Sequence, residues 1–166
     1  FRSKRRAILE HLERERERCI LNGEMLAIGM CDVDRFKTIN DTHGHQTGDK
    51  VLCGIAHLLR ESVRSYDAVG RLGGEEFLIV AAMPVGADPW QLFDKLRQQL
   101  CRTPIVTRAG ALPVTLSIGV CAAARDSGLD EMLALADEAL YQAKSQGRNR
   151  TVCKDCLREN PDHSSP

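Results

Sequence analysis

The sequence predicts an α+β domain in which helices pack on a mixed, largely antiparallel sheet. Segments with the apolar pattern of buried strands alternate with segments of helical period along most of the chain. Two strand-like segments flank LGGE, residues 72–75, where glycines supply the positive φ angles of a tight hairpin turn. A hairpin makes its strands antiparallel, which excludes a purely parallel sheet. At 166 residues, 43% of them apolar, the chain suits one domain with one core.

Composition and charge disfavour several classes of protein, although a neutral total can still contain a local basic pocket. The 23 basic and 23 acidic side chains cancel, so the chain lacks the basic excess typical of nucleic-acid binders. No apolar stretch reaches the roughly 18 residues of a membrane span, and no signal peptide opens the sequence. The seven scattered cysteines, with Cys31, Cys53 and Cys121 in apolar runs, favour buried free thiols in a reducing cytosol. We therefore expect a cytoplasmic domain that contacts neither a nucleic-acid polymer nor a membrane.

The first half of the chain predicts a helix, a buried strand and a second helix. Residues 7–20 have apolar side chains at helical spacing, and the charge run ERERER at 13–18 is expected to face solvent. The apolar stripe consists of Ile8, Leu9, Leu12, Cys19 and Ile20. Residues 25–31 form a continuous apolar run that predicts a buried strand. The next helix is expected to open at Thr47 or Gly48.

The second half predicts two more helices and a second hairpin. Asp88 suits an N-cap, with Pro89 as the first helical residue. Residues 104–107 and 113–122 are expected to pair as a hairpin. The last helix is expected to follow a capping pair, Ser127 and Asp130.

The C-terminal end of the chain loses its periodicity. Gly147 is the expected C-cap of the last helix. From residue 152 onward no helical or strand pattern continues, so residues 153–166 are expected to form a flexible tail. Cys153 and Cys156 form one C-x-x-C with His163 nearby, which without a second pair is more typical of a tail than of a zinc site.

Carboxylates lie at the end of the first predicted strand and at the tip of the first hairpin. Asp32 and Asp34 are two residues apart, so both point to one side if the strand persists. Mg²⁺ is commonly bound by one or two carboxylates plus substrate phosphates, so Asp32 with Glu75 or Glu76 is the candidate pair. Taken singly, each acid is more often a cap or a solvated turn residue.

Cations and amides suited to phosphate occur in two places. Lys144 and Arg148 lie four apart at the end of a helix, although basic residues also favour helix C-termini without any ligand. DRFK can turn directly into a short helix, whose free N–H groups at Arg35 and Phe36 would donate to phosphate oxygens. Asn40 and Asp49 have donors and acceptors that suit a purine edge. The two cations would complement a triphosphate, whereas residue type alone does not assign Asn40 and Asp49 to a purine.

Four stretches together resemble a GGDEF-domain diguanylate cyclase over roughly residues 1–152. They are DVDRFKTINDTHGHQTGD, RSYDAVGRLGGEEF, LSIGV and ADEALYQAKSQGRNR. The hairpin turn matches the family signature, with glutamate at its third position, a variant that active members also carry. The resemblance implies a palm-like, largely antiparallel sheet flanked by helices and related to class III nucleotidyl cyclases.

The resemblance also implies an activity and partners. A homodimer holding one GTP in each subunit would form the second messenger cyclic di-GMP (c-di-GMP) and release two pyrophosphates. The D-x-L-T segment that usually precedes the first helix is absent, so we expect a truncated N-terminal edge to a catalytic domain spanning residues 1–152. We expect a sensor or regulatory domain in the full-length protein. A membrane anchor elsewhere in that protein is compatible with this expectation.

The resemblance assigns catalytic roles to residues of this sequence. Mg²⁺, or Mn²⁺ in its place, would be held by Asp32, the backbone carbonyl of Val33 and Glu75. Glu76 would either help to bind metal or act on the attacking hydroxyl. Gly73 and Gly74 would let GTP approach the backbone closely, and Asn40 and Asp49 would recognise guanine. The backbone amides of Arg35 and Phe36 would bind phosphate. Lys144 and Arg148 would neutralise the β- and γ-phosphates.

A second site is suggested by RSYD. Arg64 and Asp67 match the family's R-x-x-D motif for product inhibition, since five residues separate Asp67 from Gly73. Arginine can bind a guanine or phosphate bidentately, and aspartate can accept from guanine. A simple surface ion pair is the alternative. The assisting arginine of the family has Lys95 or Arg97 as its nearest match here.

Three other functions compete with catalysis. The first is a non-catalytic c-di-GMP receptor, which the retained Asp32, Glu75, Lys144 and Arg148 disfavour. The second is a cyclase of relaxed base choice, which Asp49 disfavours because adenine would present an acceptor to its carboxylate. The third is a scaffold that only dimerises its parent protein, which would need no phosphate-binding or metal-binding groups.

Overall fold

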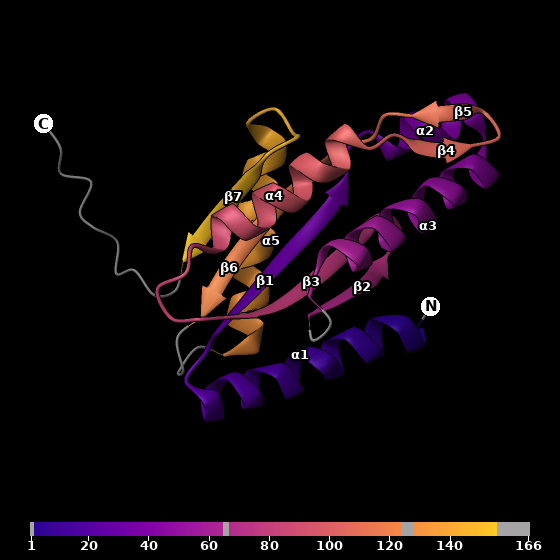
Figure 1. The fold of residues 1–166 in the computed structure, drawn as a ribbon. Coiled ribbons are helices and arrows are strands. Elements are labelled where there is room, and N and C mark those ends of the chain that lie inside the picture. Colours follow the sequence, from indigo (N-terminus) through magenta and orange to yellow (C-terminus); the bar gives the residue numbers. More distant parts are fainter. Residues whose placement is uncertain (1, 65–66, 124–127, 156–166) are drawn as a thin grey trace, which may run out of the picture.

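The structure, a computed structural model, describes residues 2–64, 67–123 and 128–155. Five strands form a central sheet with helices on both faces, which confirms the α+β prediction (Figure 1). The strands of this sheet are β1 (Met25–Val33), β2 (Ala68–Gly73), β3 (Glu76–Met83), β6 (Leu116–Ala123) and β7 (Thr151–Asp155). The helices are α1 (Arg2–Asn22), α2 (Phe36–His43), α3 (His45–Ser62), α4 (Pro89–Arg102) and α5 (Leu129–Ser145).

The strands lie in the order β2-β3-β1-β6-β7. Neighbours are antiparallel except β6 and β7, which are parallel and are joined through α5. The central strand β1 is buried along its whole length, as its continuous apolar run predicts. Its register places Asp32 opposite Glu76 of β3 and opposite Ser117 of β6.

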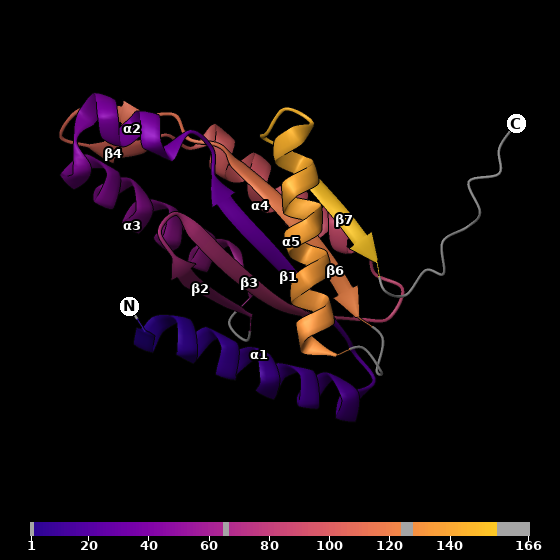
Figure 2. The ribbon, with the colours of Figure 1, turned by 180° about the vertical axis from the view of Figure 1, so that it is seen from behind.

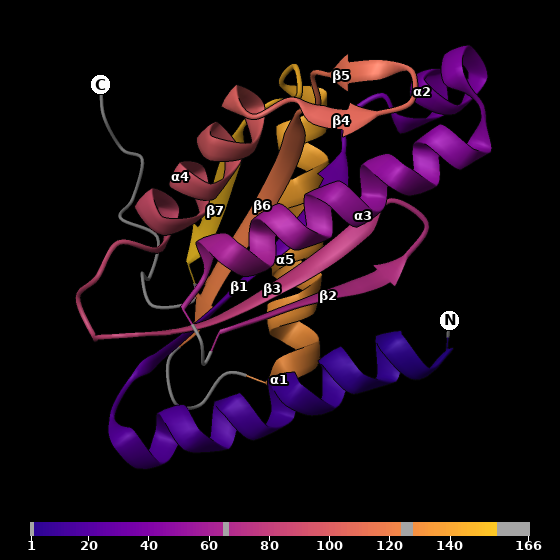
Figure 3. The ribbon, with the colours of Figure 1, turned by 45° about the vertical axis from the view of Figure 1, so that its right-hand side comes forward.

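Each face of the sheet has its own hydrophobic core. Helices α3 and α4 cover one face, and α1 and α5 cover the other (Figures 2 and 3). Successive side chains of β1 alternate between the two cores, so that Ala27 packs toward α3 and α4 whereas Ile28 packs toward α1 and α5. Fully burying an aliphatic side chain such as Ile28 stabilises the fold by about 1.5–3 kcal/mol.

Helix α5 approaches the sheet closely at a glycine of β6. A Cβ at Gly119 would lie 2.1 Å from the carbonyl oxygen of Ala136 and 2.2 Å from the amide nitrogen of Leu140. Any larger residue would therefore push the α5 backbone away from β6. This contact sets the distance between α5 and the sheet.

Several predicted boundaries are confirmed. The hairpin through residues 72–75 forms between β2 and β3. The Asp88 carboxylate caps α4 by accepting from the amide of Trp90 at 3.0 Å. The C-cap of α5 is Gln146 rather than the predicted Gly147, which comes next with a φ of 123°. Helix α3 begins at His45, slightly before the predicted Thr47 or Gly48. Ser127, the predicted cap of the last helix, lies outside the described residues.

The predicted second hairpin is wrong. Residues 105–107 form β4 (Ile105–Thr107), which pairs with β5 (Gly110–Leu112) as a separate two-stranded sheet. Gly110, with a φ of 102°, follows the turn that joins them. Strand β6 pairs instead with β1 and β7, because an apolar run indicates a strand but does not specify its partner.

The predicted C-terminal boundary at residue 152 is also wrong. Strand β7 runs to Asp155 and lies parallel to β6, so residues 153–155 belong to the sheet rather than to a tail. The strand is too short for a period to be recognised. Residues 156–166, including Cys156 and His163, lie outside the described part.

Three predicted exposures differ from the structure. Glu15, within the charge run of α1, is 9% exposed, and its carboxylate accepts from the Arg18 guanidinium at 2.9 Å. Ile20, predicted in the apolar stripe, is 37% exposed. Cys53 is exposed, whereas Cys31 and Cys121 are buried, and all three are free thiols. Among the described helices, none is long and apolar enough to cross a membrane.

Candidate active site

The candidate site lies at one end of the sheet, where β1 ends and β3 and β6 begin. The antiparallel register places Asp32 beside Glu76, and the Val33 amide donates to the carbonyl of Glu75 at 3.2 Å. The two hairpin glutamates are therefore held next to the end of β1 by backbone pairing. The predicted proximity of Asp32 to the hairpin carboxylates is confirmed.

Helix α5 brings a cation to the same place. The Lys144 ammonium forms an ion pair with the Asp32 carboxylate, which is 7% exposed. A buried carboxylate without such a partner would be strongly destabilising, since desolvation penalises its charge. Lys144 thus neutralises the candidate metal ligand in this state of the protein.

Glu76 is partly buried beside these charges. Burial raises the pKa of Glu76 above its ordinary value of 4.5, the neighbouring charge of Asp32 raises it further, and Lys144 opposes the shift. The acids Asp137 and Glu75 add smaller upward contributions. Glu76 therefore accepts a proton more readily than an exposed glutamate does.

The glycines of the hairpin leave space beside the carboxylates. Gly74 has a φ of 51°, a left-handed conformation that a side chain disfavours. Gly73 has no such angle, and a Cβ at either position would meet nothing within 4 Å. The Arg71 Nε holds the turn by donating to the Gly74 carbonyl at 2.7 Å. Packing within the domain therefore does not require glycine at position 73.

Asp34 lies next to this site and organises the chain after α5. Its buried carboxylate accepts from the hydroxyls of Thr115 at 2.7 Å and Ser117 at 2.6 Å. It also accepts from the backbone amide of Asn149 at 2.9 Å. Asn149 and the preceding Arg148 have φ angles of 44° and 63°. Asp34 thus fixes a left-handed segment that carries the candidate phosphate ligand Arg148.

Helix α4 supports the same segment from outside. The Arg97 guanidinium donates to the Asp94 carboxylate at 2.7 Å and to the Asn149 side-chain oxygen at 2.8 Å. Hydrogen bonds and charge from Arg97, with a bond from Gln98, lower the pKa of Asp94 against the opposing effect of burial. Asn149 was not among the site residues predicted from the sequence. One feature of the sequence could have indicated it: asparagine tolerates the left-handed conformation, and Asn149 lies shortly after the glycine that follows α5.

Helix α2 follows directly after Asp34, as predicted. It begins at Phe36, and Arg35 before it has a φ of 54°. First-turn amides of a helix have no intrahelical acceptor, so these N–H groups are directed outward from the helix start. The predicted amide pair at Arg35 and Phe36 therefore lies beside the end of β1.

The two predicted guanine-reading residues lie on α2 and α3. The side-chain oxygen of Asn40 is buried and, among the described residues, has no hydrogen-bond partner. A Cβ at Gly48 would lie 1.8 Å from this oxygen, so glycine is required for Asn40 to lie over α3. Asp49, next in the chain, is exposed. A buried acceptor without a partner costs stability unless a ligand donates to it.

Oxygen donors of the kind that Mg²⁺ prefers are present at the site. The predicted set of Asp32, the Val33 carbonyl and Glu75 contains two carboxylates and one carbonyl. Within the described part of the chain, no three His, Cys, Asp or Glu side chains are grouped to hold a metal ion. Two carboxylates and one carbonyl leave further positions of an octahedral ion open, and Mg²⁺ commonly fills such positions with water and substrate phosphates.

The predicted second site is distinct from this one. Arg64 Nε and Asp67 Oδ2 are 3.3 Å apart, and Arg64 also donates to the carbonyl of Ala82. The Asp67 carboxylate is 2% exposed, and its Oδ1 has no partner among the described residues. Of the two candidate assisting cations, Lys95 is exposed and Arg97 is held by Asp94 and Asn149.

Comparison with known proteins gives a consistent result. A family model described as diguanylate cyclase, GGDEF domain, matches residues 3–150. The response regulator PleD of Caulobacter vibrioides is 39% identical over 153 residues, which cover 90% of this chain. This chain spans about a third of the length of PleD, 34%.

Solved structures show the same fold. The GGDEF domain of DgcB from Caulobacter crescentus, in complex with c-di-GMP, is 27% identical with a TM-score of 0.81, and the match covers 90% of this chain and 89% of that one. The active GGEEF domain of a diguanylate cyclase from Vibrio cholerae is 33% identical with a TM-score of 0.73, and the match covers 82% of this chain and 87% of that one.

Proposed function

The chain belongs to the GGDEF-domain family of diguanylate cyclases, and from this we propose that it condenses two molecules of GTP into c-di-GMP and two pyrophosphates. The observation that carries the proposal is the convergence at one end of the sheet. Asp32, the hairpin glutamates and Lys144 meet there, beside the segment that presents Arg148.

In the proposed binding mode, the nucleotide lies between α2 and the hairpin. The buried oxygen of Asn40 and the carboxylate of Asp49 accept from guanine, whose edge presents ring and amino N–H donors. The open surface over Gly73 and Gly74 admits the phosphates against the backbone. The amides of Arg35 and Phe36 donate to phosphate oxygens.

Charge neutralisation is shared by two cations and a metal ion. Bound Mg²⁺, or Mn²⁺, held by Asp32, the Val33 carbonyl and Glu75, would supply Lewis-acid activation of the hydroxyl and the phosphate. Lys144 leaves Asp32 and turns to the β- and γ-phosphates, and Arg148 joins it there. Pyrophosphate departs with its charge already compensated, which lowers the barrier to in-line attack.

The remaining step is removal of a proton from the attacking 3′-hydroxyl. Glu76 suits this role because its raised pKa makes it the better proton acceptor, although its position next to Asp32 also suits a metal ligand. One domain offers one nucleotide site of this kind, so ring closure requires two domains facing each other. We therefore propose catalysis by a homodimer.

We also propose that Arg64 and Asp67 bind the product and inhibit the enzyme. The buried Asp67 oxygen without a partner supports this, since guanine can donate to it. The Arg64–Asp67 pair would have to open for Arg64 to reach the ligand. Arg64→Ala should therefore retain catalysis and lose inhibition by added c-di-GMP.

The test is incubation of the purified, heat-stripped and refolded protein with GTP and Mg²⁺, followed by mass spectrometry of the nucleotides. The proposal predicts c-di-GMP in this sample, and in the heat-released extract if the product site is real. If the extract contains c-di-GMP but fresh GTP stays intact under forced dimerisation, the domain is a receptor. If neither sample contains it, the proposed function is wrong.

A matched pair of variants tests the role of Lys144. Lys144→Met removes the cation at the site, whereas Lys154→Met removes a lysine whose partner is Glu138, 3.0 Å away. Losing one charge-assisted contact to phosphate should weaken GTP binding roughly tenfold or more in the first variant. Calorimetric titration measures this, and equal affinities in the two variants would contradict the assignment.

A further inference from the structure

A polar stripe of α4 lies against the chain that follows α5, where α4 runs beside β7 (Figure 3). Its members recur at helical spacing, so they share one side of the helix. They are Trp90, Asp94, Arg97 and Cys101. The Trp90 indole donates to the Thr151 carbonyl at 2.9 Å, and the Arg97 guanidinium donates to the Asn149 carbonyl at 3.3 Å. Cys101 Sγ is 4.0 Å from the Asn149 side-chain nitrogen. The stripe therefore follows the chain from Asn149 to Thr151.

The Arg97 side chain is itself held in one orientation. Its Nε donates to Asp94 Oδ1 at 2.7 Å, and Gln98 donates to Asp94 Oδ2 at 2.8 Å, so both carboxylate oxygens have a partner. Asp94 is 4% exposed, and the side chain of Arg97 is 15% exposed. A guanidinium is a rigid planar fork, so fixing its Nε also fixes the direction of Nη1. Nη1 is the atom that donates to Asn149.

Net stability is a poor explanation for this ion pair. Removing two charges from water costs about as much free energy as their attraction gains, so apolar residues of similar size often stabilise a fold equally well. A buried ion pair does impose a fixed geometry. The pair is therefore explained better by the group that it orients, the Asn149 side chain, whose oxygen accepts from Arg97 at 2.8 Å.

Asn149 determines how Arg148 is presented. Both residues have left-handed backbone angles, which are unfavourable for residues other than glycine unless other contacts hold them. Arg148 is exposed, and its side chain has no hydrogen-bond or ion-pair partner among the described residues, so its backbone sets its direction. Arg97 restrains that backbone by binding the carbonyl and the side chain of Asn149. Asp34 binds the Asn149 amide from the other side at 2.9 Å.

The same contact decides between the two cations considered for the product site. Arg64 of that site donates to the carbonyl of Ala82, near the end of β3. The active end of the sheet is at Glu76, where β3 begins, which is about 20 Å away along an extended strand. Arg97 donates to the segment at the active end. Its donors are therefore engaged there, and Lys95 remains as the cation for the product site.

We propose that Arg97 is a positioning residue for the phosphates of GTP. Held by Asp94, it fixes Asn149, and through Asn149 it keeps the Arg148 guanidinium directed at the β- and γ-phosphates. This role rests on the proposed function, because Arg148 is a phosphate ligand only if GTP binds at this end of the sheet. Helix α4, which supplies no ligand, would thus set the affinity for the triphosphate.

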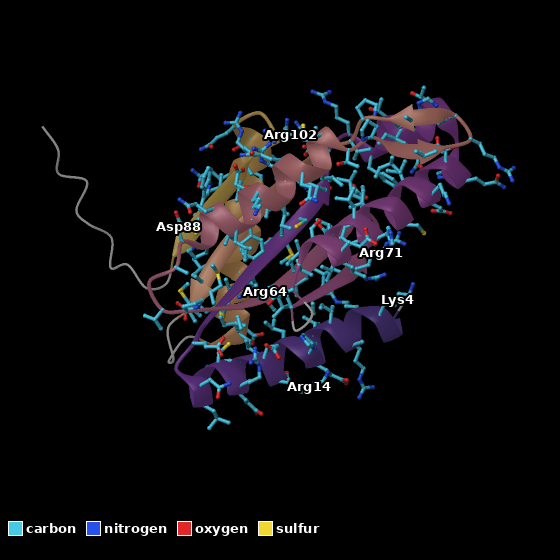
Figure 4. The ribbon with its side chains drawn as sticks, viewed as in Figure 1. Lys4, Arg14, Arg64, Arg71, Asp88 and Arg102 are labelled. Carbon is cyan, nitrogen blue, oxygen red and sulfur yellow. The ribbon has the colours of Figure 1, made fainter. Side chains whose placement is uncertain are left out.

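A triphosphate that cannot react isolates this effect. 3′-Deoxyguanosine triphosphate lacks the attacking hydroxyl, and calorimetric titration with Mg²⁺ measures its affinity for the native protein and for Arg97→Met. The proposal predicts a loss of roughly three- to tenfold, as expected when one positioned hydrogen bond is removed. Arg102→Met is the matched control and should bind like the native protein, because Arg102 is exposed at the last position of α4 (Figure 4).

A second background distinguishes positioning from general support of the fold. If Arg97 acts through Arg148, Arg97→Met should change the affinity little in a protein that already carries Arg148→Met, because coupled residues are not additive. Guanosine monophosphate, which lacks the β- and γ-phosphates, should bind equally to the native protein and to Arg97→Met. A structural defect would weaken the binding of both ligands in both backgrounds.

Asn149→Gly tests the same contact without disturbing α4, and it decides the matter if Arg97→Met fails to fold. Glycine adopts the left-handed angle of this position without strain, and the ion pair of Asp94 with Arg97 stays intact. The variant lacks the side-chain acceptor. It should therefore lose affinity for the triphosphate to a similar extent and keep its affinity for the monophosphate.

The possible failures are distinguishable. Triphosphate binding that is unchanged in both Arg97→Met and Asn149→Gly would overturn the positioning role alone. An equal loss in Arg97→Met with and without Arg148 would also overturn it, because Arg97 would then act by another route. No binding of the triphosphate by the native protein would overturn the proposed cyclase function and the positioning role with it.

Discussion

At the scale of single residues, the two hairpin glycines have different reasons to be glycine. Gly74 adopts a left-handed backbone angle, whereas Gly73 does not and has open space beside it. The first is therefore explained by conformation within the chain. The second is explained only by something that approaches the backbone from outside.

Alanine variants separate the two explanations. Gly74→Ala should lower the free energy of unfolding by about 1–2 kcal/mol, because a side chain disfavours the left-handed region. Gly73→Ala should change stability by less than about 0.5 kcal/mol, as surface substitutions usually do, yet weaken GTP binding. Thermal denaturation and GTP titration of both variants measure this. A large loss of stability in Gly73→Ala would contradict the reading of that position.

Glu76 predicts a pH dependence of stability. Because its pKa is raised in the folded protein, the folded state holds a proton that the unfolded state has already released above pH 4.5. Its stabilising contribution is therefore fully present below pH 4.5 and decreases as the pH rises through the folded pKa. The melting temperature of Glu76→Gln, relative to the native protein, should rise across this window. A difference that is constant with pH would exclude the shift.

The residue types at the site were predictable, but their contacts were not. Alternation of side chains predicted Asp32 and Asp34 on one side of an extended strand, but β1 ends at Val33 and Asp34 follows it in a turn. The sequence does not reveal that Asp34 holds Asn149, since this contact joins residues 115 positions apart. The ion pair of Asp32 with Lys144 joins residues 112 positions apart and depends on where α5 crosses the sheet.

At the scale of elements, the chain after α5 is held from two sides. Asp34 at the end of β1 fixes its backbone, and Arg97 of α4 fixes the Asn149 side chain. Two consecutive non-glycine residues with positive φ rarely persist without such restraint. Helix α4 therefore contributes to the active end of the sheet although none of its side chains was predicted there.

Substituting Asp34 tests this restraint. Asp34→Ala leaves the Asn149 amide and two hydroxyls without their acceptor, which should cost about 1–3 kcal/mol of unfolding free energy. It should also raise the KM for GTP, because Arg148 loses its fixed position. Asp34→Asn keeps one acceptor oxygen and should restore part of both effects. An unchanged KM in Asp34→Ala would show that the segment is positioned by other contacts.

Element pairing marks the limit of prediction from sequence. The first hairpin was predictable because LGGE leaves the two strands no other short connection. No such link joins β4 to β6, which were predicted to pair. Strand β4 pairs with β5, whereas β6 pairs with β1 and β7. A parallel partner such as β7 is reached only through the crossover helix α5, so local patterns do not indicate it.

At the scale of the whole molecule, β7 closes one edge of the sheet. The Thr151 carbonyl accepts from the Trp90 indole at 2.9 Å, which ties this edge to α4. A chain ending at Arg150 would expose the edge of β6 and free Trp90. For a domain of this size, each kcal/mol lost lowers the melting temperature by about 2–4 °C.

We expect this shortened chain to melt at least several degrees below the full one. Trp90→Phe in the full chain provides the control, since it removes the hydrogen bond to Thr151 and leaves the strand in place. Calorimetry of the three proteins measures the difference. Equal melting temperatures for the shortened and full chains would show that β7 adds nothing to the stability of the fold.

The strand order has a consequence for how the molecule is made. The innermost strand is synthesised early, yet one of its neighbours, β6, and the helix that supplies Lys144 emerge from the ribosome late. Pairings between segments so far apart in sequence form slowly, because a long loop must close first. The nascent chain therefore cannot assemble this end of the sheet until β6 and α5 have both been translated.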